Sequence, residues 1–375
     1  MSAETKVDAI LPTPRHLPSL DGLRGVAILL VLCHQFDRIQ VTAATGPGVR
    51  IFDYALNVGW IGVQLFFVLS GFLITGILMD AKGCPNFIRN FYVRRALRIF
   101  PLYFGALMVF LVALPNLGLA PKSWGEVDFA YWVFLSNWFG GEALPHFWSL
   151  AVEEQFYFAW PFVVLALNAR QVGAVCLALA VASLMARILM VGFGVSPDAI
   201  YQVTLSRLDA LALGGAAAVL IRLPQGVLAR LRDPAALWIL AFAVAAAGFV
   251  VTRGYPRTST LGQTVGYSAL ALSFAFVVLA LALRDSKGTE HPGPASLFSH
   301  PLLCMAGKFS FGMYVFHKPL HDLLGKPVLR ILGGVQGVGM AVGYLAAALI
   351  LTFAVGALSY WAYERHFLAL KASWH

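Results

Sequence analysis

Charged residues are scarce in this sequence. Asp, Glu, Lys and Arg make up 12% of its 375 residues, hydrophobic residues make up 59%, and the mean hydropathy is +0.76. An ordinary soluble domain is about one quarter charged. The composition therefore excludes an ordinary soluble globular protein and indicates an integral membrane protein.

Paired cysteines are also missing. Cys33, Cys84, Cys176 and Cys304 are scattered singly, so the sequence indicates no CxxC redox pair, no metal site and no disulfide. The formal net charge of +9 accompanies apolar runs rather than a basic domain. We interpret this charge as a signal of membrane topology and of contact with anionic membrane lipids, and we expect no nucleic-acid partner.

Long hydrophobic runs are what the chain has instead. Runs long enough to cross a hydrocarbon layer of about 30 Å recur from end to end, and they differ from the short alternating strands of membrane β-barrels. We predict an all-α, polytopic integral membrane protein with about ten transmembrane helices. The expected spans are 20–38, 58–79, 93–114, 147–167, 172–193, 206–222, 236–252, 263–283, 300–320 and 335–362.

The distribution of basic residues gives the expected orientation. Most Lys and Arg residues fall in segments that face the cytoplasm if the N-terminus is inside, and an even number of spans then places both termini there. We expect a single membrane domain over residues 1–375, with short cytoplasmic tails at about 1–18 and 368–375 and no appended soluble domain. The first 19 residues lack the pattern of a cleavable signal, so the first span is expected to act as its own anchor.

Glycines are concentrated near the end of the chain. The segment GGVQGVGMAVG, residues 333–343, repeats glycine at small-xxx-small spacing. This spacing predicts tight packing of the last helix against a neighbour.

Ionisable residues within the apolar spans are candidates for function, because a charge in lipid is costly. In SLDGLRGVAILLVLCHQF, Arg24 lies near the start of the first span and His34 lies deep in the apolar run. A neutral imidazole can take a proton from a hydroxyl near neutral pH, as acyl transfer to an alcohol requires. The alternative is a histidine that bridges two helices by hydrogen bonds.

Arginines gather at the cytoplasmic start of the third span, in NFYVRRALRIFP. Arg94 and Arg98 share one helix face, with Arg95 to one side. Guanidinium groups placed in this way suit the phosphates of a cytosolic donor. The same cluster also fits the ordinary orientation signal of a membrane protein.

Two adjacent carboxylates, Glu153 and Glu154, lie within the largely apolar segment HFWSLAVEEQFYFAWPF. One explanation is structural: Ser149 caps the helix and the carboxylates interact with its dipole. The other is functional, since Glu153 and His34 are expected at similar depth and Glu153 could orient the histidine as a base. Further along, Arg207 and Asp209 in SRLDALALGG are too close in sequence to pair on one helix, so each needs a partner elsewhere.

Seven segments in this order resemble acyltransferase family 3, which comprises multi-span membrane acyltransferases that modify surface polysaccharides, lipid-linked sugars, peptidoglycan and some small metabolites. The resemblance covers nearly the whole chain. It rests on SLDGLRG, GVQLFFVLSGFLIT, NFYVRRALRIFP, FWSLAVEEQFYF, SRLDALALGG, GKFSFGMYVFHKPL and SYWAYERHF.

The resemblance implies an O-acyltransferase of the bacterial cytoplasmic membrane. The expected donor is cytosolic acyl-CoA, most simply acetyl-CoA, which is a substrate rather than a permanently bound cofactor. The expected acceptor is a hydroxyl of a glycan, a glycolipid or another cell-surface molecule. By motif, the implied catalytic residues are His34, Glu153 and Ser149, and the implied donor-binding residues are Arg94, Arg98, Arg95 and Arg24. His317 also lies in a family motif, without an assigned role.

The chain departs from the family pattern in its first span. The family usually places ten residues between the arginine and the histidine, whereas nine separate Arg24 from His34. At about 100° per residue, this turns His34 by about 80° from the expected face and puts Gln35 in its place. A local bulge in the helix could restore the geometry.

Two alternatives stay open from the sequence. Ser149 could form an acyl-enzyme intermediate, although His146 is the one histidine near it in the sequence. The chain could also be a transporter or flippase of a lipid-linked or acidic sugar, because buried Arg, Glu and His residues also line permeation routes.

Overall fold

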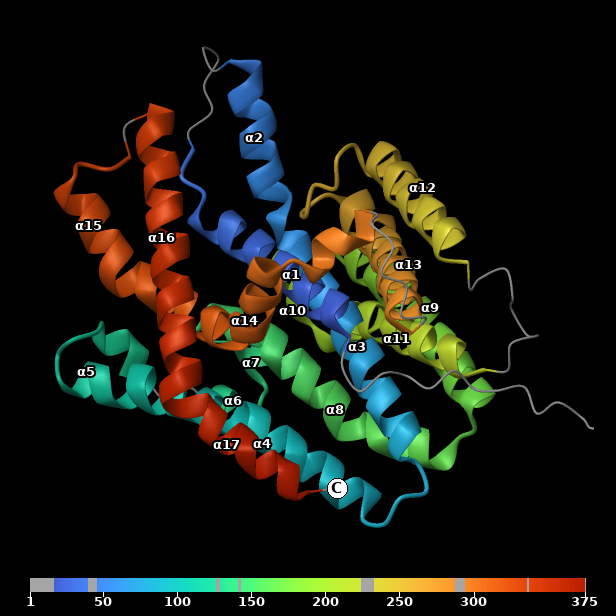
Figure 1. The fold of residues 1–375 in the computed structure, drawn as a ribbon. Coiled ribbons are helices and arrows are strands. Elements are labelled where there is room, and N and C mark those ends of the chain that lie inside the picture. The colour runs from blue at the N-terminus through green and yellow to red at the C-terminus, as the bar shows by residue number, and fades with distance from the viewer. Residues whose placement is uncertain are drawn as a thin grey trace, which may run out of the picture.

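The computed structural model describes residues 17–39, 46–125, 129–140, 143–223, 233–286, 294–335 and 337–374, which contain many helices and no β-strand. Eight helical stretches of these residues are long and apolar enough to cross a membrane. Together these findings confirm the prediction of an all-α polytopic membrane protein (Figure 1). The number of ten crossings and the cytoplasmic position of both termini stay predictions.

Each predicted span coincides with a long helix. These helices are α1 (Pro18–Phe36), α3 (Ile61–Ala81), α4 (Phe87–Leu107), α8 (Trp148–Ala166), α9 (Ala169–Gly192), α11 (Thr204–Arg222), α12 (Pro234–Thr252), α13 (Tyr267–Ser286), α14 (Pro301–Leu320) and α16 (Gly337–Ser359). Of these ten helices, α8 and α14 are not among the eight stretches that are long and apolar enough to cross a membrane. They carry polar residues that the candidate site uses.

Shorter helices connect the long ones. They are α2 (Pro47–Asn57), α5 (Leu114–Asn116), α6 (Phe129–Trp132), α7 (Ser136–Phe139), α10 (Pro197–Gln202), α15 (Lys326–Ile331) and α17 (Arg365–Leu370). Several helices, among them α1, α12 and α14, begin at a proline. Proline fits there because the first N–H groups of a helix have no partner within the helix.

Glycines allow the central helices to approach closely. An added Cβ on Gly307 of α14 would lie 1.9 Å from the carbonyl oxygen of Asp21 in α1, and one on Gly71 of α3 would lie 1.8 Å from that of Leu211 in α11. Neither helix pair could accept a larger residue without moving apart. Figure 1 shows α1 and α3 at the centre of the bundle, with α12 and α16 at opposite edges.

The glycine-rich segment before α16 behaves differently from the prediction. Gly333, Gly334 and Gly337 have φ angles of 73°, 89° and 79° and belong to the chain that leads into α16. An added Cβ on Gly339 or Gly343 would meet no described heavy atom within 4 Å. The prediction of tight packing is therefore wrong, because these glycines supply turns and an open helix face at the edge of the bundle.

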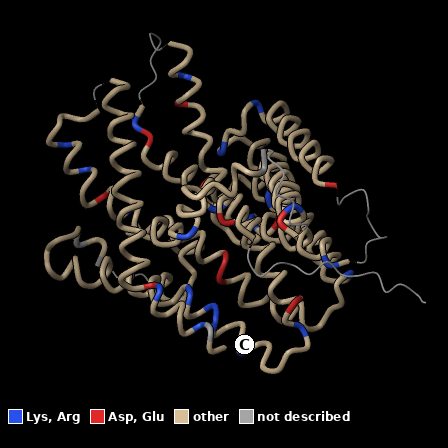
Figure 2. Tube along the Cα trace, viewed as in Figure 1, with Lys and Arg blue, Asp and Glu red and all other residues tan. Residues whose placement is uncertain are grey.

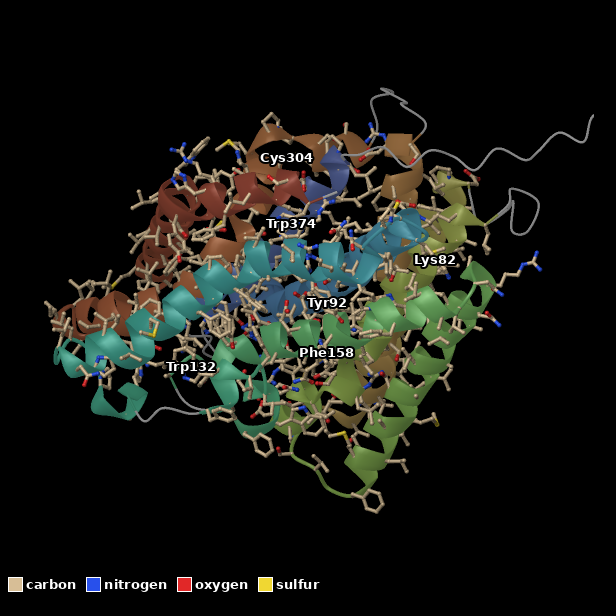
Figure 3. All side chains as sticks on the ribbon, turned by 90° about the horizontal axis from the view of Figure 1, so that it is seen from below. Lys82, Tyr92, Trp132, Phe158, Cys304 and Trp374 are labelled. Atoms are coloured by element: carbon tan, nitrogen blue, oxygen red, sulfur yellow. The ribbon has the colours of Figure 1, made fainter. Side chains whose placement is uncertain are left out.

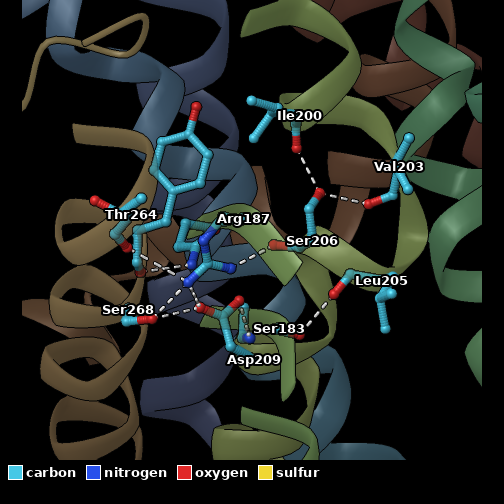
Figure 4. A network of polar contacts seen from close by, with 12 residues as sticks. Ser183, Arg187, Ile200, Val203, Leu205, Ser206, Asp209, Thr264 and Ser268 are labelled. Carbon is cyan, nitrogen blue, oxygen red and sulfur yellow. Dashed lines mark hydrogen bonds and ion pairs between the residues drawn. The ribbon is translucent and has the colours of Figure 1, made fainter. Parts of the chain in front are cut away.

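A buried ion pair joins three of the long helices (Figure 4). Arg187 of α9 lies with its Nη2 atom 2.8 Å from Oδ2 of Asp209 in α11, and both side chains are fully buried. Ser268 of α13 contacts both partners, at 2.5 Å from Arg187 and 3.0 Å from Asp209. The spacing of Asp209 from Arg207 predicts that Asp209 pairs with a residue elsewhere, and Arg187 on α9 is that partner.

Arg207 finds a different environment. Its side chain is fully buried, and its guanidinium lies 4.7 Å from the ring centroid of Tyr267 and 4.8 Å from that of Tyr201. The rings of Phe67 and Trp148 lie within 6.0 Å. Aromatic faces stabilise this cation, so its role in the fold is structural.

The close contact at Gly307 gives a test of the packing. Gly307→Ala is expected to lower the free energy of unfolding by about 1–3 kcal/mol, because the new methyl group forces α1 and α14 apart. Gly48→Ala is a matched control, since an added Cβ there meets no described atom within 4 Å. Thermal unfolding in detergent measures both variants, and equal stability of the two would contradict the predicted packing.

The buried ion pair gives a second test. Arg187→Met leaves the Asp209 carboxylate buried without its cation and is expected to reduce stability by about 3–5 kcal/mol. The double variant Arg187→Met/Asp209→Leu removes both charges and is expected to recover part of that loss. A double variant that is as unstable as the two single variants combined would argue against this explanation. The measurement is again thermal unfolding.

Candidate active site

A small polar chamber lies inside the bundle, with a volume of about 100 Å³. Helices α1, α3, α4, α8 and α14 contribute to its walls. The polar and charged lining residues are Arg24, Ser70, Arg95, Arg98, Ser149, Glu153, Glu154, Tyr157, Lys308, Ser310 and Tyr314. Residues from five helices therefore converge on one polar space.

A much larger cavity, of about 880 Å³, lies at the end of the bundle where α1 begins and α3 ends. The predicted topology places this end in the cytoplasm. Arg24, Ser70, Arg95 and Arg98 line both the chamber and the larger cavity. We call the three shared arginines the arginine neck, because they lie where the two spaces adjoin.

The four predicted donor-binding arginines come together in the lining of the larger cavity. Arg94 joins Arg24, Arg95 and Arg98 in the lining of the larger cavity. The guanidinium of Arg95 lies 4.0 Å from the ring centroid of Tyr157 on α8. Figure 2 shows the basic stretch of α4 near the C-terminus, with the acidic stretch of α8 close to it in the same view.

Glu153 and Glu154 face the chamber, which explains how an apolar segment tolerates two carboxylates. The hydroxyl of Tyr157 donates to Oε2 of Glu153 at 3.2 Å, and Ser70 in turn makes a short hydrogen bond with Tyr157. Glu154 has a buried carboxylate oxygen, Oε1, without a hydrogen-bond partner among the described residues. Protein rather than lipid surrounds both groups.

Ser149 lies at the head of α8. Its hydroxyl is 2.6 Å from the hydroxyl of Tyr314, which donates to the carbonyl oxygen of His146 at 2.8 Å. The N-cap of α8 is Phe147, without a side-chain cap. Ser149 is therefore available to the chamber, and the expectation that it caps the helix is wrong.

His34 does not join this group. Helix α1 is a regular α-helix from Pro18 to Phe36, so the bulge that could have turned His34 into register does not form. His34 packs beside Gly59, and its ring faces the backbone of Leu56 and Asn57. The structure therefore brings Glu153 and Ser149 together but leaves His34 outside the chamber lining. Its catalytic role stays a prediction.

Two histidines lie behind Tyr314 instead. The rings of His146 and His317 are 4.6 Å apart between centroids. His317 is fully buried, with Nδ1 2.6 Å from the carbonyl oxygen of Tyr314. Neither histidine lines the chamber, so their contacts support the position of Tyr314.

Five polar residues of the chamber were not predicted from the sequence: Ser70, Tyr157, Lys308, Ser310 and Tyr314. Tyr157 has a local signal, because it follows Glu153 by four residues and so shares its helix face. Lys308 and Tyr314 reach the chamber through the packing of α14 on α1 and carry no signal of that packing within their own helix. The ammonium of Lys308 also lies 4.6 Å from the ring centroid of Tyr360.

Comparison with known proteins identifies the family. The family model described as an acyltransferase domain matches residues 17–363. The peptidoglycan O-acetyltransferase OatA of Listeria monocytogenes is 27% identical over 342 residues, which cover 84% of this chain and 51% of that protein. A Bacillus subtilis protein named "Putative peptidoglycan O-acetyltransferase YrhL" is 30% identical over 351 residues, covering 84% of this chain and 50% of that protein.

The chain thus spans about half the length of the curated relatives it matches. No solved structure matches it. The relatives are bacterial, in agreement with the expected bacterial cytoplasmic membrane. Because the family match extends over nearly all of the described helices, the chain belongs to acyltransferase family 3.

Proposed function

We propose that the protein transfers an acyl group, in the first instance acetyl, from acyl-CoA on the cytoplasmic side to a hydroxyl of a cell-surface carbohydrate. The observation that carries this proposal is the arginine neck between a large cavity and a small polar chamber. The names of the relatives favour a glycan such as peptidoglycan as the acceptor. Membrane lipids surround the helices.

The two cavities suit the two ends of the donor. The larger cavity, at 880 Å³, has the volume of an ordinary ligand pocket and takes the nucleotide end. The chamber, at 100 Å³, has room for little more than the thioester. Arginines bind phosphate through several parallel hydrogen bonds, so the neck holds the phosphates while the acyl arm passes inward.

Glu153 is the group that we assign to proton transfer. It lines the chamber near the neck and is held by Tyr157, whereas His34 lies outside the lining. The acceptor hydroxyl gives its proton to Glu153 as its oxygen attacks the thioester carbonyl carbon. The bond from carbon to sulfur breaks, and the thiolate of CoA takes the proton from Glu153.

Ser149 and Tyr314 complete the outer end of the chamber. Both residues line the chamber, and we assign their hydroxyls to hydrogen-bond the thioester oxygen as it gains negative charge, with the Tyr314 proton turning from the carbonyl oxygen of His146. A covalent relay through Ser149 is the second route. Direct transfer is favoured because the hydroxyl of Ser149 is hydrogen-bonded to Tyr314 rather than to a histidine that could activate it.

Removal of a neck arginine tests the donor site. Arg98→Ala is expected to raise the KM for acetyl-CoA about 10- to 100-fold, because hydrogen bonds to a charged group contribute about 1.5–3 kcal/mol each. Arg170→Ala is the control, since Arg170 is an exposed arginine outside both cavity linings. Release of free CoA by purified protein with glycan acceptors gives the rates. An unchanged KM in Arg98→Ala would contradict the placement of the phosphates.

A second set of variants tests the base. Glu153→Gln keeps the shape of the side chain and is expected to lower kcat about 10²- to 10⁴-fold, the usual contribution of a general base. Glu154→Gln, the adjacent isosteric change, is expected to have a smaller effect. If His34→Ala abolishes CoA release while Glu153→Gln does not, the base is His34. No release with any acceptor, together with no thermal shift from acetyl-CoA, would favour a transporter or flippase.

A further inference from the structure

A third cavity lies apart from the candidate active site, between α16 and the end of α14. Its volume is about 170 Å³, larger than that of the chamber. All of its lining residues are apolar except His321, Tyr344 and Thr352, and none of them lines the chamber or the larger cavity. We call this space the edge cavity, because α16 lies at the edge of the bundle.

The edge cavity opens at membrane depth. Leu324, Val328 and Leu351 line it and are 41–49% exposed, so they form its mouth. Helix α16 belongs to an apolar stretch long enough to cross a membrane. Figure 1 shows this helix at one edge of the bundle, and Figure 3 shows the red C-terminal helices on the side away from Lys82. An apolar opening of this kind suits a hydrocarbon chain of a membrane lipid.

A chain of hydrogen bonds ends at the polar rim of the edge cavity. Nη2 of Arg38 lies 2.8 Å from Nε2 of His321, and Nδ1 of His321 lies 2.6 Å from the hydroxyl of Tyr344. An arginine only donates, so Nε2 accepts and the ring proton lies on Nδ1, which donates to Tyr344. The Tyr344 hydroxyl makes no other hydrogen bond among the described residues. Its own proton is therefore available to an oxygen atom in the cavity.

Arg38 supplies a cation at the same rim. Its Nη1 atom donates to backbone carbonyl oxygens, and among the described residues it forms no ion pair with a carboxylate. The neighbouring carboxylate of Asp37 accepts instead from Asn57, at 3.3 Å. A guanidinium has five N–H donors, so some remain for an anion. One imidazole ring, that of His321, separates this cation from the Tyr344 hydroxyl.

We propose that the edge cavity binds one chain of a membrane phospholipid, with the ester carbonyl of that chain on the Tyr344 hydroxyl and the phosphate on Arg38. A short glycerol segment separates the phosphate and the ester carbonyl of a phospholipid, and the single imidazole ring between the two donors has a similar length. Hydrogen bonds from arginine to phosphate are among the strong ones, because both partners are charged. The proposal concerns a separate site and does not rest on the proposed function.

Gly325 makes the rim possible. An added Cβ on Gly325 would lie 2.6 Å from the hydroxyl of Tyr344 and 3.0 Å from Nδ1 of His321. A larger residue there would push the hydroxyl away from the imidazole and narrow the cavity. An added Cβ on Gly343, the residue before Tyr344, would meet no described atom within 4 Å. Gly325→Ala and Gly343→Ala are therefore a matched pair of variants.

Two lipids that differ only in their linkage test the inference. The purified full chain in detergent is titrated with dioleoyl phosphatidylglycerol and with its ether-linked analogue, which lacks the ester carbonyls, and native mass spectrometry gives the dissociation constants. Wild type is expected to bind the ester lipid about 2- to 10-fold more tightly, as one hydrogen bond between neutral groups provides. Tyr344→Phe is expected to bind the two lipids equally. A preference that survives in Tyr344→Phe, or equal binding by wild type, overturns the proposal.

Further variants test the phosphate and the rim. Arg38→Gln is expected to weaken both lipids about 10-fold, because both carry the phosphate and a hydrogen bond to a charged group is stronger than a neutral one. Gly325→Ala is expected to lose the preference for the ester lipid, whereas Gly343→Ala keeps it. Unchanged binding in Arg38→Gln would contradict the placement of the phosphate, and equal behaviour of the two glycine variants would contradict the role of the rim.

Thr352 distinguishes a hydrocarbon chain from a more polar occupant. Its side chain lines the edge cavity two helical turns from Tyr344, is 1% exposed, and has a hydroxyl without a hydrogen-bond partner among the described residues. Thr352→Val keeps the shape and removes the hydroxyl. Unchanged binding of both lipids is expected, since a hydrocarbon chain makes no hydrogen bond there. Weaker binding would show that the occupant brings a polar group to this depth and would overturn the proposal.

Discussion

The cost of placing a charge at membrane depth governs this structure. A buried ion without a partner is destabilising by several kcal/mol, so each one must find another ion, an aromatic face or a polar cavity. Asp209 pairs with Arg187, Arg207 lies among aromatic rings, and Glu153 and Glu154 face the chamber. In the ion pair and among the aromatic rings, protein groups surround the charged side chain. The chamber instead leaves space for a substrate beside the carboxylates, so a reaction is feasible there.

The chamber in turn depends on how closely the central helices approach. Arg24 of α1 and Tyr314 of α14 line one cavity because α1 and α14 meet at Gly25 and Gly307 with almost no side chain between them. On the other side, the short hydrogen bond of Ser70 with Tyr157 joins α3 to α8. The two contacts fix opposite walls of the same space, which keeps Ser149 and Glu153 in register with the arginine neck.

Much of the fold was predictable from sequence, because length and apolar composition alone define a membrane helix. The gathering of Arg94 and Arg98 was also predictable, since their i, i+4 spacing places them on one face of α4. The position of His34 shows the limit. One residue of helix turns a side chain by about 100°, so the missing residue between Arg24 and His34 decides which neighbour the imidazole meets.

The contacts between helices could not be predicted from the local sequence. The pairing of Asp209 with Arg187, and the arrival of Lys308 and Tyr314 in the chamber, depend on contacts between helices far apart in the chain. The glycines at 333–343 show the reverse error, because a spacing that permits close packing does not supply a partner.

The difference in volume between the two cavities has a consequence for acyl selectivity. If the nucleotide end is anchored at the neck, the thioester always reaches the same depth, and the acyl group must fit into what remains of a 100 Å³ space. The small volume of the chamber would then limit the length of the acyl group that the protein accepts.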